Sequence, residues 1–203
     1  MKNKSVNVDT ILNMARKKGI LRVRDVTEKG VHPEYLRRLV DKGLLIRRGR
    51  GLYSLSDVDV TSDHSLAEAA KRIPKGIICL LSALRFHEIG SQSPHQVWIA
   101  LKRASTGRPR VDYPPVHIVV FSKKALTEGI DEHNIEGVIV RIYNPAKTVA
   151  DCFKYRNKIG LDVAIEALRD CWRQKQCTMD DLWYYAQICR VSNVMRPYLE
   201  SLV

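Results

Sequence analysis

Three short segments at the start of the chain repeat apolar residues with helical spacing, and each of them ends at a glycine. The glycines are Gly19, Gly30 and Gly43. Glycine adopts positive φ angles without strain and therefore often ends a helix. The apolar stripe of the first segment consists of Val8, Ile11, Leu12 and Ala15. This spacing predicts an amphipathic helix, with Asn7 as its expected N-cap.

The next two segments predict a helix-turn-helix. The second spans 22–29, and the third begins at Pro33, a residue suited to the first turn of a helix. The inward stripe of the third segment consists of Leu36, Leu39 and Val40. Two helices joined by three residues that include a glycine are typical of a helix-turn-helix.

A β-hairpin is predicted directly after the third helix. Residues 44–55 read LLIRRGRGLYSL, with two apolar runs around a turn whose two glycines, Gly49 and Gly51, can adopt positive φ angles. A hairpin in this place is the wing of a winged helix. We therefore expect residues 1–56 to form a winged helix-turn-helix DNA-binding domain.

The charge of the chain is concentrated in the same region. The 203 residues carry a net charge of +12, and residues 1–55 hold 14 basic and 5 acidic side chains, which gives +9. Residues 56–203 are nearly balanced at +3. A basic, solvated surface without a partner would have the same bulk charge. The asymmetry together with the winged-helix pattern favours a nucleic-acid-binding module attached to a different domain.

Several polar residues of the third helix share the face opposite its apolar stripe. This face consists of Glu34, Arg37, Arg38 and Asp41. The two arginines can each donate a forked pair of hydrogen bonds to guanine or to a phosphate, and Glu34 can accept one from cytosine. We expect Tyr35 to flank this face and His32 to cap the helix. The expected phosphate contacts are Arg24, Lys42, Arg47, Arg48 and Arg50.

The second half predicts a separate α+β domain over residues 65–203. A polar segment, 57–65, marks the boundary, with Ser65 as the expected cap of a helix that ends at Arg72. The spacing of the apolar residues alone does not decide whether residues 77–81 form a strand or a helix. The strands of a small sheet are expected at 97–101, 116–121 and 137–143. A C-terminal helical cluster is expected at 145–155, 161–174, 178–189 and 196–202, with Asn144 as the cap of the first helix and a Thr-x-x-Asp capping pattern at Thr178.

Three stretches of the chain resemble the AbiEi antitoxins of bacterial abortive-infection toxin–antitoxin systems. They read GVHPEYLRRLVDKGLLIRRGRGLYSL, LLSALRFHEIG and YNPAKTVADCFKYRNKIGLDVAIEALR. The resemblance implies a phage-defence regulator whose winged helix represses the promoter of its own operon, at sites expected to be inverted repeats. It also implies a C-terminal domain that counteracts a nucleotidyltransferase-like toxin, with direct contact to the toxin left open.

Motifs for catalysis, cofactors and metals are missing from the sequence. The histidines have no metal-ligand spacing, and no phosphate-binding loop or nucleophile elbow is present. Asp151, Lys154 and the pair Asp180-Asp181 would suit a nuclease, but a chain this charged offers such sets by chance. We therefore expect no enzyme, no cofactor and no metal. The five cysteines lack a CxxC pair and are expected to be reduced packing residues.

A basic loop in the second half is a possible second contact with a polyanion. Its cations are Lys102, Arg103, Arg108 and Arg110. Basic loops also serve solubility, so this contact stays open.

The longest nearly apolar stretch, 77–84, is too short to cross a bilayer, and the N-terminus lacks the apolar region of a secretory signal. We expect a cytoplasmic protein. Two alternatives to the antitoxin remain: an interaction scaffold that binds nucleic acid non-specifically, and a stand-alone regulator without a toxin.

Overall fold

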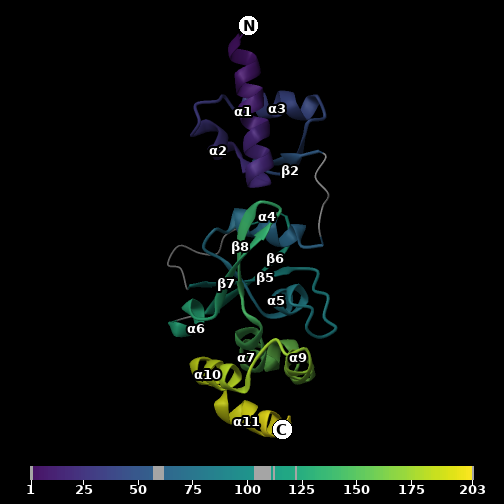
Figure 1. The fold of residues 1–203 in the computed structure, drawn as a ribbon, viewed down its shortest axis with the longest axis vertical. Coiled ribbons are helices and arrows are strands. Elements are labelled where there is room, and N and C mark those ends of the chain that lie inside the picture. Colours follow the sequence, from purple (N-terminus) through teal and green to yellow (C-terminus); the bar gives the residue numbers. More distant parts are fainter. Residues whose placement is uncertain (1, 57–61, 103–110, 112, 122, 203) are drawn as a thin grey trace. The chain divides into compact units, whose positions relative to one another are not determined.

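The chain forms two compact units in a computed structural model that describes residues 2–56, 62–102, 111, 113–121 and 123–202 (Figure 1). Unit 1 comprises Met1–Lys71 with Asn134–Ile139, and unit 2 comprises Arg72–His133 with Val140–Val203. A compact unit is not the same as an independently folding domain. The predicted domain limits, 1–56 and 65–203, therefore stay predictions.

The N-terminal region of unit 1 has the predicted winged-helix arrangement. Its elements are α1 (Lys2–Lys18), β1 (Ile20–Arg22), α2 (Val23–Thr27), α3 (Glu34–Asp41), β2 (Leu45–Gly49) and β3 (Leu52–Leu55). The three strands form an antiparallel sheet in the order β1-β3-β2, so that β2 and β3 make the predicted wing. The core contains Ile11, Val26, Leu36, Leu39 and Leu45, none of them more than 1% exposed.

Three details of this region differ from the sequence predictions. Asn7 lies inside α1 and does not cap it, because the helix extends back to Lys2 through residues that tolerate helix without adding to its apolar stripe. The three-residue strand β1, too short to show an alternating pattern, was not predicted. Gly49 lies in β2, and only Gly51 of the two turn glycines has a positive φ, at 73°.

The second half of the chain contains a five-stranded sheet and a cluster of helices, which confirms the α+β class. The strands are β4 (Ile77–Ile78), β5 (Val97–Lys102), β6 (Val116–Phe121), β7 (Ile130–Ile135) and β8 (Val138–Tyr143). The sheet has the order β6-β5-β4-β8-β7. The pairs β4–β8 and β5–β6 are parallel, and β4–β5 is antiparallel. The last two strands are joined by the two-residue turn Glu136-Gly137, in which both residues have positive φ angles.

The helices described after the winged-helix region are α4 (His64–Arg72), α5 (Leu80–Phe86), α6 (Lys124–Thr127), α7 (Pro145–Lys154), α8 (Arg156–Ile159), α9 (Leu161–Arg173), α10 (Met179–Cys189) and α11 (Ser192–Glu200). Of these, α7, α9, α10 and α11 form a cluster at the C-terminal end of the chain (Figure 1). Helix α7 packs against α5, α9 and α10. The predicted caps are present, since Asn144 accepts a hydrogen bond from the Lys147 amide and Thr178 forms a capping box with Asp181.

Other features of the second half depart from prediction. Ser65 is the second residue of α4, not its cap, and the carbonyl oxygen of Asp63 accepts hydrogen bonds from the first turn instead. The ambiguous segment 77–81 divides between β4 and α5. Helix α11 begins at Ser192, four residues before its predicted start. The elements β7, α6 and α8 were not predicted. In the described part of the chain, no helix has the length and apolar character needed to cross a membrane.

Asp25 links three elements of unit 1. Its carboxylate accepts hydrogen bonds from the amide of Arg22, at 2.8 Å, and from the Lys18 ammonium, at 2.9 Å. Partial burial acts to raise the pKa of Asp25, but these two bonds hold the pKa below its ordinary value. The carboxylate therefore ties the end of α1 and the start of α2 together when it is ionised.

We expect Asp25→Asn to lower the stability of this region by about 1 kcal/mol at pH 7, the usual effect of losing a helix cap. A carboxyl whose pKa is lowered by folding stabilises the protein above its unfolded pKa of about 3.9, and this contribution disappears as the pH falls through the folded value. The difference between the variant and the natural protein should therefore vanish in acid. Amide hydrogen exchange in α2 and α3 of the full chain measures it. A difference that is the same at every pH would contradict this account.

Candidate nucleic-acid interface

One face of α3 carries the polar side chains that the sequence assigned to it. Glu34, Arg37, Arg38 and Asp41 are all exposed. On the opposite face Leu36 and Leu39 are buried, because the helical period places them toward the core. The predicted division of this helix into a core face and a solvent face is therefore confirmed.

Arg38 and Glu34 bind each other on this face. The Nη2 and Nε atoms of Arg38 lie 2.7 Å and 3.1 Å from Glu34 Oε1, and the guanidinium lies 5.5 Å from the centroid of the Tyr35 ring. The hydrogen bond and the charge of Arg38 lower the pKa of Glu34. The two groups thus form one paired unit in the free protein, and Glu34 is not an open acceptor.

Arg37 differs from its neighbour. Its side chain is exposed and makes no hydrogen bond or ion pair with any other residue that the structure describes. The same holds, within the described ranges, for Lys42 after α3 and Arg50 in the turn of the wing. These three cations are directly available to an anionic partner.

The three arginines of the wing differ in their exposure and in their hydrogen bonds. Arg47 is exposed, and its Nε donates a long hydrogen bond of 3.4 Å to the carbonyl oxygen of Gly49. Arg48 is only half-exposed, because its Nε donates to Ser54 Oγ across the hairpin at 2.9 Å. The register of β2 and β3 shifts between Arg47 and Gly49, which is a β-bulge, and a bulge redirects a side chain.

Two further predicted residues lie nearby in the same unit. Arg24 projects from α2 with 82% of its side chain exposed and pairs with Glu28 at 2.8 Å. His32 accepts a hydrogen bond from the Glu34 amide through Nδ1, at 3.2 Å, but it is not the predicted N-cap, because α3 begins at Glu34 and Pro33 occupies the cap position. In unit 2, Lys102 of the basic loop is the exposed last residue of β5, and Arg103, Arg108 and Arg110 lie outside the described residues.

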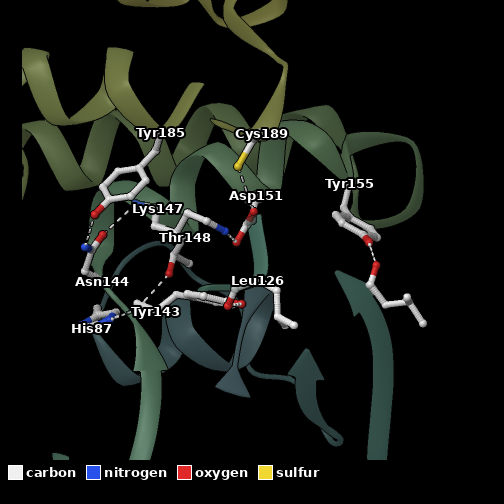
Figure 2. A network of polar contacts seen from close by, with 11 residues as sticks. His87, Leu126, Tyr143, Asn144, Lys147, Thr148, Asp151, Tyr155, Tyr185 and Cys189 are labelled. Atoms are coloured by element: carbon white, nitrogen blue, oxygen red, sulfur yellow. Dashed lines mark hydrogen bonds and ion pairs between the residues drawn. The ribbon is translucent and has the colours of Figure 1, made fainter. Parts of the chain in front are cut away.

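Unit 2 contains a buried polar network at the start of α7 (Figure 2). Asn144 caps this helix and also donates to the hydroxyl of Tyr185 on α10, at 2.9 Å. The carbonyl oxygen of Tyr143 accepts hydrogen bonds from His87 Nε2 and from the Thr148 hydroxyl. The network thereby joins the end of β8 to α5, α7 and α10.

An ion pair without solvent exposure lies at the centre of this network. Lys147 Nζ is 2.5 Å from Asp151 Oδ2, and the side chains are 0% and 2% exposed. The Lys147 ammonium also lies 4.1 Å from the centroid of the Tyr143 ring, and Asp151 Oδ1 accepts from the Cys189 thiol. Burial raises the pKa of Asp151, against the opposing effects of Lys147 and Cys189. Burial likewise lowers the pKa of His87, which suits a neutral ring that donates to the Tyr143 carbonyl.

The acidic residues and the lysine that would suit a nuclease, Asp151, Lys154 and the pair Asp180-Asp181, do not all come together in the structure. Asp151 and Lys154 line one cavity of about 100 Å³ next to Cys189. Asp181, in contrast, lies in the first turn of α10 and binds Thr178, whereas Cys189 ends that helix. A helix rises about 1.5 Å per residue, so the Asp181 backbone is about 12 Å from that of Cys189. Among the described residues no group of three metal-binding side chains occurs.

Sequence reasoning did not single out Lys147. The available signal was the four-residue spacing of Lys147 and Asp151 along a predicted helix. The spacing predicts a pair, but a solvated surface pair has the same spacing. Only the packing of α5, α9 and α10 around α7 makes this pair a buried one.

We expect Lys147→Met to lower the free energy of unfolding of unit 2 by about 3–5 kcal/mol, because it leaves Asp151 buried without its counter-ion. Lys154→Met, on an exposed position of the same helix, is the matched control and should change it by about 0.5 kcal/mol or less. Urea unfolding followed by the fluorescence of Trp98, Trp172 and Trp183 measures both variants. Equal effects of the two changes would show that the buried pair has no special role in stability.

Comparisons with known proteins agree with this architecture. Residues 9–56 match a family model described as "Transcriptional regulator, AbiEi antitoxin". The chain is also similar to the crystal structure of the RV2827C protein from Mycobacterium tuberculosis, with a TM-score of 0.57 and 13% sequence identity. The similar region covers 90% of this chain and 71% of the other chain, and at this identity it shows a similar fold alone. No curated protein matches the sequence. The resemblance seen in the sequence is thus confirmed for residues 9–56, which match the model of the AbiEi antitoxin family of transcriptional regulators.

Proposed function

We propose that the protein is a cytoplasmic, sequence-specific DNA-binding repressor of its own operon and the antitoxin of a toxin–antitoxin pair. The observation that carries the proposal is the exposed face of α3 beside a basic wing, within a segment that matches a family of transcriptional regulators. This half of the chain holds most of the excess positive charge, which suits the phosphate backbone of DNA.

In this proposal α3 lies in the major groove and Arg37 reads a base. Arg37 needs to break no hydrogen bond or ion pair within the described part of the protein, and its guanidinium can donate two hydrogen bonds to guanine O6 and N7. Arg38 reaches a base or a phosphate together with Tyr35, after exchanging Glu34 for the DNA. An exposed ion pair contributes only about 0–1 kcal/mol, so this exchange costs little. The released Glu34 can then accept from cytosine.

Phosphate contacts come from the wing and from the ends of the helices. Arg47, Arg50, Lys42 and Arg24 are exposed cations in the same unit. Arg48 contributes less than the sequence suggests, because it is half-buried and bonded to Ser54. An occupied promoter then excludes RNA polymerase.

The antitoxin half of the proposal assigns a separate task to the C-terminal half. That half is nearly neutral in charge, so bulk attraction to nucleic acid does not explain it. Support comes from the resemblance of the YNPAKTVADCFKY segment, which forms the polar network around Lys147, to the second half of AbiEi antitoxins. The toxin expected from that resemblance is a nucleotidyltransferase-like protein.

A footprint on the DNA upstream of the protein's own gene tests the repressor. We expect the protein to protect a pair of inverted repeats and to repress a reporter placed behind them. A shift that depends only on DNA length, with no protected sequence, would favour the non-specific scaffold. We expect a gene next to that of this protein to encode a nucleotidyltransferase-like toxin, and growth of cells that express that gene, with and without this protein, tests the antitoxin. Repression without rescue of growth would leave a stand-alone regulator.

Two arginine variants separate base reading from phosphate binding. We expect Arg37→Ala to cost about 1–3 kcal/mol on the operator and to relax the preference at one or two base pairs. Arg50→Ala should weaken binding to every sequence alike and reduce the slope of log affinity against log salt by about one. Fluorescence anisotropy with operator and scrambled duplexes at several salt concentrations measures both.

Arg173→Ala is the control for lost charge. Arg173 lies in α9 of unit 2, is 76% exposed and pairs with Asp170, so its loss removes one positive charge that does not belong to the winged-helix region. It should leave both the affinity and the salt slope unchanged. If Arg37→Ala and Arg50→Ala weaken binding to all duplexes equally, then Arg37 does not read a base and the two arginines do not have the separate roles proposed for them.

A further inference from the structure

Two cysteines of unit 2 lie next to each other. Cys171 is in the last turns of α9, and Cys177 is in the connection to α10. Their sulfur atoms are 2.6 Å apart, with the Cys171 thiol donating to Cys177. All five cysteines of the chain are free, and only these two have their sulfurs in contact within the described residues.

Hydrogen bonds to a neighbouring helix hold the connection in place. The side-chain amides of Gln174 and Gln176 donate to the carbonyl oxygens of Glu88 and His87, at 3.1 Å and 3.0 Å, just after α5. The backbone amide of Gln176 donates to the Cys171 carbonyl oxygen at 3.0 Å. Cys177 is followed directly by the capping box of α10. The two sulfurs therefore meet between fixed elements, and a bond of about 2.05 Å between them requires little movement.

The two thiols have different access and acidity. Cys171 is fully buried, whereas Cys177 is partly exposed. The hydrogen bond from Cys171 lowers the pKa of Cys177, and the same bond together with burial raises the pKa of Cys171. Burial raises the pKa of the remaining cysteines, Cys79, Cys152 and Cys189. Cys177 is thus the thiol that a reagent reaches and that ionises first.

We propose that Cys171 and Cys177 form a dithiol site that undergoes exchange with small disulfides of the glutathione type. The Cys177 thiolate attacks one sulfur of the disulfide, whose S–S bond breaks and releases one thiolate. The Cys171 thiol then loses its proton and attacks Cys177 Sγ, and the second small thiolate leaves. The two protein thiols lose two electrons and two protons, and the small disulfide becomes two thiols.

The test uses the folded, full-length protein and oxidised glutathione. After incubation, free thiols are alkylated, and the protein is digested without reductant and analysed by mass spectrometry. We expect the peptides of Cys171 and Cys177 to be linked, with a loss of two hydrogen masses that dithiothreitol reverses. Cys79, Cys152 and Cys189 are internal controls and should be recovered as alkylated thiols.

Two variants trap the steps separately. Cys171→Ala should accumulate glutathione on Cys177, because the resolving thiol is missing, and Cys177→Ser should leave Cys171 unmodified. Cys177 is partly exposed, so its variant keeps the core intact and the test remains valid if Cys171→Ala does not fold. Stable glutathione adducts on the natural protein, or five unmodified thiols at oxidant concentrations that link other protein dithiols, would overturn the proposal.

Discussion

The Lys147–Asp151 ion pair constrains the second half of the molecule more than any other contact. Moving two charges out of water costs several kcal/mol for each ion, and a partner alone rarely offsets this cost. Here the remaining polar atoms are satisfied as well, by the ring face of Tyr143 around the ammonium and by the Cys189 thiol on the carboxylate. Each of these partners comes from a different element, so the pair is stable only when β8, α7 and α10 are all in place.

This requirement explains why the polar network extends beyond the pair itself. Asn144 caps α7 and fixes its start relative to α10 through Tyr185, and the carbonyl of Tyr143 is saturated by His87 and Thr148. Buried polar groups without partners are costly, and a network in which each group is bonded specifies a unique packing. The network therefore positions the helices α5, α7 and α10 relative to one another.

Local patterns predicted much of the fold, whereas long-range contacts escaped prediction. The glycine-ended helices, the wing and the caps at Asn144 and Thr178 depend on residues a few positions apart, and the structure has them. The bond between Arg48 and Ser54 depends on a bulge that composition does not reveal. The buried pair of Lys147 and Asp151 depends on partners elsewhere in the chain, among them Cys189, which lies 38 residues beyond Asp151 and donates to its carboxylate. Sequence spacing shows that two charges are neighbours, but tertiary packing decides whether water surrounds them.

An ion pair between residues four positions apart on a helix thus has a different role in each half of the chain. Glu34–Arg38 and Lys147–Asp151 are both four residues apart on one helix. The first is about half exposed, so water and salt screen it and a phosphate or a base can replace either partner at little cost. The second is sealed by rings and helices, and opening it would leave a charge in a low-dielectric interior. Solvent exposure, rather than the residues themselves, decides which ion pair can exchange partners, with DNA in the proposed function, and which one holds the fold.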